Sequence, residues 1–142
     1  ITPVVGKETT YAINWKISNT TNPLTKTKVT TTLPIWATFK SVIVPLSENN
    51  NLVYNNATRE ITWTVGDIAR GVGYGTNNPR QVLFQIGVKP VDSQLGGPIT
   101  IINESVLTAV DSETETSITV NQKPITTKLL NENQAGNGSV TN

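Results

Sequence analysis

The sequence predicts an all-β fold in which two antiparallel sheets pack face to face. Runs of alternating apolar and polar residues recur about every ten residues, and clusters of Asn, Pro, Gly and Ser separate them. No window shows the periodicity of an amphipathic helix. Thr is β-branched, suits the half-exposed face of a sheet and occupies many of the polar positions. Together these observations favour a β-sandwich.

The composition restricts both the architecture and the function. A chain of 142 residues is long enough for one domain with a substantial core. Its net charge is +1 and it has no basic run, so nucleic acid is not an expected partner. No apolar run reaches the length of a membrane span, so we expect a chain that is not membrane-embedded. The sequence begins at Ile1 without an initiator methionine, which leads us to expect a fragment or a processed product.

The most regular alternation lies in residues 9–18. Its apolar face consists of Tyr11, Ile13, Trp15 and Ile17. The residues between them are small or polar, so this strand has one buried and one exposed face. Turn-forming residues over 19–23 end the strand. Before it, residues 1–8 contain Pro3, which favours a lead-in edge strand.

Residues 24–33 and 35–44 form the next two predicted strands. The first ends at Pro34 and the second at Pro45, because proline has no backbone N–H to donate to a ladder.

A polar loop over 47–51 leads to a short predicted strand at 52–54 and a longer one at 60–65. Residues 66–71 begin and end with glycine, and we expect them to break the sheet in a turn. They lead into a Gly/Asn-rich loop over 71–79.

The remaining strands are predicted at residues 81–88, 99–110 and 116–120, with an acidic turn over 111–115. The apolar faces of all these strands form the expected core. We predict that it contains Tyr11, Ile13, Trp15, Ile17, Leu33, Ile61, Trp63, Val65, Phe84, Ile86 and Leu107.

Four features that follow one another along the chain carry a resemblance to a known family. They are Gly6 with Tyr11 and the Asn19-Thr20 turn, Leu33-Pro34, the turn from Trp63 to Gly71, and the late strand around Asn103. In this order they resemble the conserved-repeat domain of bacterial surface proteins, an immunoglobulin-like module often catalogued as of unknown function. The resemblance covers about residues 1–120. The sequence departs from the family at Ser105, where the family has Ala, and in its long loop over 71–79.

The resemblance implies an immunoglobulin-like antiparallel β-sandwich that is a non-enzymatic structural module. Such a module is a stalk, spacer or filament subunit of a bacterial cell-surface or secreted protein. It implies an extracellular location at the cell surface and contacts with neighbouring copies or tandem domains of the same protein. The alternative is an adhesive binding module that recognises a surface glycan, a protein or another cell through the loops at 48–51 and 71–79.

Catalytic and metal-binding residues are sparse. With no His and no Cys, neither a Ser-His nor a Cys-His pair can be built, so we expect no enzyme and no cofactor. Asp111, Glu113 and Glu115 alternate in a turn, and their oxygens are weak candidates for calcium ligands. A solvated turn explains the same residues, because the spacing of a calcium-binding loop is missing. We therefore expect no metal site.

Two aromatic residues are candidate ligand contacts. Trp15 and Trp63 alternate with aliphatic residues and are expected in the core. Trp36 follows a proline at the start of a strand, where an exposed ring could stack on a sugar. Tyr74 lies in the Gly/Asn-rich loop and is the second candidate.

The alternation is lost near the C-terminus, so we divide the chain into a sandwich over 1–121 and a tail or linker over 122–142. The tail includes an apolar segment at 123–130, which Pro124 separates from the last predicted strand. We expect this segment to contact an adjacent copy or domain, and residues 131–142 to be flexible or to wrap that neighbour. A disordered linker is the alternative.

Overall fold

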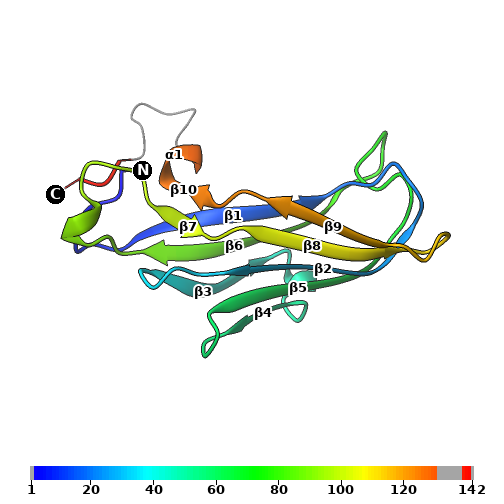
Figure 1. The fold of residues 1–142 in the computed structure, drawn as a ribbon, viewed down its shortest axis with the longest axis horizontal. Helices are drawn as coiled ribbons and strands as arrows, with labels where there is room; N and C mark the ends of the chain where they lie inside the picture. The colour runs from blue at the N-terminus through cyan, green and yellow to red at the C-terminus, as the bar shows by residue number, and fades with distance from the viewer. Residues whose placement is uncertain (1, 131–138, 142) are drawn as a thin grey trace.

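The structure, a computed structural model of the chain, describes residues 2–130 and 139–141. Its strands run along the long axis of an elongated body, and the chain's two ends lie at the same end of that body (Figure 1). There Val4 and Thr141 form an isolated parallel bridge. Two antiparallel sheets pack face to face, which confirms the prediction of an all-β, immunoglobulin-like sandwich.

The two sheets have different widths. The first has three strands in the order β1-β6-β3, and the second has five in the order β4-β5-β2-β8-β9. The strands of the first sheet are β1 (Thr9–Ile17), β6 (Arg80–Val88) and β3 (Ala37–Val44). Those of the second are β4 (Leu52–Asn55), β5 (Glu60–Ile68), β2 (Leu24–Thr32), β8 (Ser105–Asp111) and β9 (Ser117–Gln122). The wider sheet therefore has more inner surface than the narrower sheet can cover.

Short elements complete the described part of the chain. They are β7 (Thr100–Ile102), β10 (Ile125–Thr126), the 3₁₀ helices η1 (Leu46–Glu48) and η2 (Asp92–Gln94), and the single-turn helix α1 (Thr127–Leu130). Strands β7 and β10 pair with each other next to the chain termini (Figure 1).

Three rings join the sheets at the centre of the core. The Trp15 ring of β1 lies 6.3 Å from the Trp63 ring of β5 and 5.0 Å from the Phe84 ring of β6, measured between centroids. Buried aromatic rings contribute the largest apolar areas to a core. The alternation read from the sequence is confirmed, because ten of the eleven predicted core residues are buried.

Leu107 is the exception among the predicted core residues. It is only half-buried, although it points to the inner face of the sheet as its alternation predicts. The physical reason is the unequal width of the sheets, because the narrower one ends before it covers β8 and β9. Leu107 therefore packs against the core, as its predicted place there requires, but is only partly buried.

The sheet does not break at residues 66–71 as the sequence predicted. Strand β5 continues through Gly66 to Ile68. Gly66 has a φ of +82°, and the pairing with β2 shifts by one residue next to it. A glycine in this conformation forms a bulge, which lets the strand bend and continue instead of ending.

Two other predicted strands differ from the structure. The run at 99–110 is divided into β7 and β8, because the chain leaves one strand pair at Asn103 and joins another. The Asn103 carbonyl accepts a hydrogen bond from the Thr31 hydroxyl at 2.8 Å, and the backbone N–H of Asn103 donates to the Thr32 carbonyl at 3.0 Å. Residues 2–8 form no strand beyond the Val4 bridge.

The described tail residues pack on the sandwich of their own chain. Ile125 pairs with Ile102, and the backbone N–H of the buried Thr127 donates to the Ile99 carbonyl at 2.9 Å. Val140 is buried in the core. These contacts lie within one chain, and contact of residues 123–130 with an adjacent copy or domain stays a prediction. The expectation for residues 131–138 lies outside the described residues.

The three-ring cluster predicts a large loss of stability on truncation of Trp63. Trp63→Ala removes a fully buried ring and leaves a cavity, so we expect the free energy of unfolding to fall by about 3–5 kcal/mol. Urea unfolding measures this change. The exposed Val53→Ala on the neighbouring strand is the control and should change stability by less than about 0.5 kcal/mol. A loss below about 1 kcal/mol for Trp63→Ala would contradict the assignment of this core.

Candidate functional site

A buried carboxylate lies between β3 and β4. Glu48 ends the helix η1, and its Oε1 accepts hydrogen bonds from Asn51 Nδ2 at 2.8 Å and Arg80 Nη2 at 3.0 Å. The indole nitrogen of Trp63 donates to the same oxygen at 3.2 Å, while Arg80 Nε binds Oε2. The Arg80 guanidinium also lies over the Trp63 ring, with its central carbon 5.8 Å from the centroid. We call these four residues the Glu48 cluster.

The Glu48 cluster holds its carboxylate in the ionised form. The hydrogen bonds from Arg80 lower the pKa of Glu48 most, and Asn51 and Trp63 lower it further, so the pKa falls from 4.5 to about 2 against the opposing effect of burial. A carboxylate that is ionised and surrounded by donors is a poor general acid or base near neutral pH. The role that its contacts do support is structural. They join η1 and the following loop to β5 and β6, and so close the β3–β4 side of the sandwich.

The two loops that the sequence predicted as ligand contacts meet beside the Glu48 cluster. A groove of about 780 Å³ lies there, with Asn51 from one loop and Asn78 and Pro79 from the other among its lining residues. The carboxamides of Asn14 and Gln81 also line the groove, and the apolar part of its surface comes from Val44, Pro45, Pro79 and Leu83.

The candidate aromatic contacts lie elsewhere. The indole nitrogen of Trp36 donates to the Thr100 carbonyl at 2.8 Å, and the ring is half-buried against the core. Tyr74 is 48% exposed in the loop over 71–79, which hydrogen-bonds to Asn19 at another part of the molecule. The structure does not bring Trp36 and Tyr74 together, and neither lines the groove beside the Glu48 cluster. Their contact with a ligand stays a prediction.

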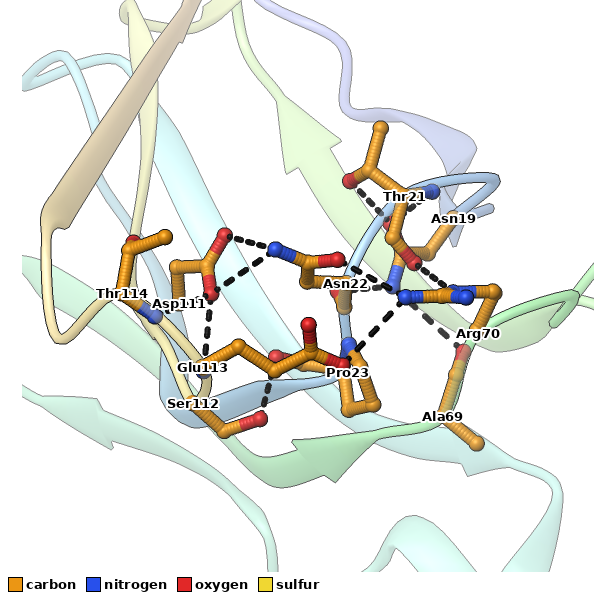
Figure 2. A network of polar contacts seen from close by, with 10 residues as sticks. All are labelled: Asn19, Thr21, Asn22, Pro23, Ala69, Arg70, Asp111, Ser112, Glu113 and Thr114. Carbon is orange, nitrogen blue, oxygen red and sulfur yellow. Dashed lines mark hydrogen bonds and ion pairs between the residues drawn. The ribbon is translucent and has the colours of Figure 1, made fainter.

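A second polar network, drawn in Figure 2, holds the end of the sandwich that lies away from the chain termini in Figure 1. The guanidinium of Arg70 donates to the Thr21 carbonyl at 3.2 Å and to Asn22 Oδ1 at 2.8 Å. It also lies 3.3 Å from Glu113 Oε1. Both partners of this ion pair are more than half exposed, so the pair contributes little stability by itself. The network sets the relative positions of three turns.

The candidate metal ligands take part in this network in different ways. Asp111 accepts the backbone N–H groups of Glu113 and Thr114, at 2.9 and 3.0 Å, and the side chain of Asn22 (Figure 2). These donors, the Thr114 backbone first, lower the pKa of Asp111. Glu113 turns to Arg70, and Glu115 occupies a position with φ of +60°. Among the described residues no group of three or more His, Cys, Asp or Glu side chains converges as a metal site requires.

A third feature is a groove of about 890 Å³ on the side of the sandwich between β1 and β9. We call it the lateral groove. Its apolar lining includes Trp15, Ile17, Leu107, Ile118 and Val120. Nothing in the sequence predicts this groove, because each of these residues follows the alternation of an ordinary core strand.

No local sequence pattern predicts the Glu48 cluster either. Glu48 lies in a polar run that is typical of an exposed loop, and Arg80 is 32 positions away along the chain. Only the fold brings them together, because η1 follows β3 and Arg80 begins the neighbouring strand β6.

Comparison with known proteins informs the fold. No family model and no curated protein matches the sequence. Among solved structures, the chain resembles BcpA, the major pilin subunit of Bacillus cereus, with a TM-score of 0.54 and 13% identity. The match covers 88% of this chain and 36% of the pilin chain. The chain thus shares its sandwich architecture with a part of that pilin subunit.

The described residues include no helix with the length and apolar character needed to cross a membrane.

The Glu48 cluster predicts a pH-dependent stability. Because the folded-state pKa of Glu48 is depressed from 4.5 to about 2, its ionisation stabilises the fold above pH 4.5, and this contribution is lost as the pH falls towards 2. We expect Glu48→Gln to lower the free energy of unfolding by roughly 2–3 kcal/mol at pH 7. The difference from wild type should shrink to near zero at pH 2.

Urea unfolding of both proteins from pH 2 to pH 7 measures this difference. The exposed Glu104→Gln is the matched control and should follow wild type at every pH. A Glu48→Gln difference that stays constant with pH would show that the carboxylate is not ionised by these contacts.

Proposed function

We propose that the chain is a non-enzymatic structural module, a stalk, spacer or filament subunit, of a bacterial cell-surface or secreted protein. The observation that carries the proposal is that both clusters of polar side chains join secondary-structure elements to one another. The Glu48 cluster closes one side of the sandwich, and the Arg70 network holds one end. Both serve to fasten secondary-structure elements to each other, which is what a module that transmits tension requires.

The two resemblances support the same proposal from different directions. The order of sequence features is similar to that of the conserved-repeat domain of bacterial surface proteins. Independently, the fold is similar to part of a protein described as a major pilin subunit. A protein that shares both properties is expected outside the cell and in contact with neighbouring copies or tandem domains.

The groove beside the Glu48 cluster favours a second candidate function, recognition of a surface glycan. Carboxamides from Asn14, Asn51, Asn78 and Gln81 line it. Carboxamides both donate and accept hydrogen bonds, which suits the hydroxyl groups of a sugar. The groove's charged residues, Glu48 and Arg80, neutralise each other, so a neutral ligand fits better than an ionic one.

Localisation on intact cells tests the structural proposal. An antibody raised against the folded chain, followed by immunogold electron microscopy of the producing cells, should label the outer surface or fibres that extend from it. An antibody against a ribosomal protein is the control for broken cells. Label confined to the cell interior would contradict the proposal.

Glycan-array binding distinguishes the second candidate. Strong binding of the isolated chain to defined glycans, lost in an Asn78→Ala variant that unfolds like wild type, would favour the adhesive module over the structural one.

A further inference from the structure

Three short segments from distant parts of the chain meet at the end of the body where both termini lie (Figure 1). These segments are residues 3–5, 95–97 and 139–141. Parallel bridges join Val4 to Thr141 and Leu95 to Val140, so the last segment is bonded to both of the others. We call the three segments the terminal clamp.

The last segment of the terminal clamp uses its backbone on both sides. Thr141 donates its N–H to the Pro3 carbonyl at 2.9 Å and accepts a hydrogen bond from the Val5 N–H at 2.8 Å. Val140 makes the corresponding pair with residues 96–97, donating at 2.8 Å and accepting at 3.0 Å. Four hydrogen bonds therefore join the last described segment to the first one and to the loop that contains η2.

The terminal clamp is also fixed to the sandwich. The Val140 side chain is 2% exposed and belongs to the core, and Val5 packs against the same core. The Gly6 N–H donates to the Pro90 carbonyl at 3.0 Å, which joins the first segment to the chain that follows β6. The clamp is therefore continuous with the folded body.

The direction of the segments decides how they respond to a pull on the two ends of the chain. Residues 3–5 and 139–141 run parallel, so tension draws Pro3 and Thr141 in opposite directions along the segments. The two hydrogen bonds between these segments are then sheared together and share the load. An antiparallel pair pulled at one end would instead lose its bonds one after another.

The position of the two ends decides which part of the molecule is loaded first. Both ends lie at the same end of the elongated body, and the terminal clamp joins them there (Figure 1). Tension between the ends therefore acts on the clamp before it reaches the three-ring core around Trp63.

We propose that the terminal clamp is the element that bears tension first, and that its backbone hydrogen bonds set the force at which the module begins to extend. The core sets the equilibrium stability, and the clamp sets the resistance to a pull on the chain ends. This inference rests on the proposed function, because a module joined to neighbours at both ends is pulled in this way.

Constant-force stretching of the full chain, with handles attached to its two ends, tests the proposal. Thr141→Pro removes the N–H that bonds the Pro3 carbonyl, at a position whose side chain is exposed. We expect the first extension step to occur about 2–10 times faster than in wild type, the factor that one hydrogen bond contributes. The full factor should appear in the rate, because a bond that breaks first is already lost in the transition state.

A different pulling direction provides the matched control. The chain has no native cysteine, so handles can also be attached through Val53→Cys and Val120→Cys. Both positions are exposed, and they lie on β4 and β9, the two outer strands of the wide sheet. Force between them does not pass through the terminal clamp, so Thr141→Pro should extend at the rate of the protein without this substitution.

A core substitution separates mechanical resistance from equilibrium stability. Ile61→Val removes one methylene group from a fully buried side chain, so the urea midpoint should fall. When the chain is pulled by its ends, the first extension step of Ile61→Val should stay within about twofold of wild type, because the core is intact when the clamp opens. Urea unfolding of Thr141→Pro verifies that this variant folds.

Three outcomes would overturn the inference. They are an unchanged first step when Thr141→Pro is pulled by its ends, equal acceleration in both pulling directions, and acceleration by Ile61→Val as large as that by Thr141→Pro. If one of these occurs while immunogold labels the cell surface, the inference fails and the proposed function stands. Label confined to the cell interior contradicts the proposed function whatever the force measurement shows.

Discussion

A tryptophan indole nitrogen in an apolar core needs a hydrogen-bond acceptor, and much of this structure follows from meeting that need for Trp63. The acceptor is Glu48, which must then be buried and ionised. A buried carboxylate is costly unless it is paired, so Arg80 and Asn51 complete its surroundings. These groups come from η1, the following loop and the start of β6. The hydrogen bond that the Trp63 ring requires therefore holds three segments together. The same contacts close the β3–β4 side of the sandwich.

The contrast between the two sides of the sandwich follows from the number of strands. A five-stranded sheet faces a three-stranded one, and the excess width lies at β8 and β9. On the β3–β4 side, stacked rings and the Glu48 cluster complete the core. On the β1–β9 side, residues 2–130 and 139–141 provide no equivalent closure, and aliphatic side chains remain partly exposed. The two sides of the sandwich therefore differ in how completely the described residues cover the core.

The alternation of apolar residues allowed most of this fold to be predicted from the sequence. Strand β1 is the clearest case, because every second side chain from Tyr11 to Ile17 points inward and is buried. Alternation reports which face of a strand a residue occupies, but not whether another strand covers that face. For this reason Leu107 was placed correctly on its face, although it is only partly buried. Gly66 illustrates a second limit, because a glycine that ends a strand and one that forms a bulge look the same in the sequence.

The candidate sites were less accessible to sequence reasoning than the fold. Glu48 and Arg80 are brought together because η1 follows β3 and Arg80 begins the neighbouring strand β6, and the lateral groove arises from a difference in sheet width. Neither leaves a local motif. The acidic turn, in contrast, has a visible pattern, and the structure shows Asp111 as a turn cap and Glu113 as the partner of Arg70. Side chains with the chemistry of a ligand site can thus serve the turns that hold a sandwich together.

Backbone hydrogen exchange of wild type and Glu48→Gln at pH 7 tests the account most directly. If the Glu48 cluster ties η1, the following loop and the start of β6 together, amides within residues 46–51 should exchange faster in the variant than in wild type. Amides in the turns around Asn22 and Asp111 should keep the wild-type exchange rates. Equal exchange of the two proteins over residues 46–51 would contradict the central place of this carboxylate in the fold.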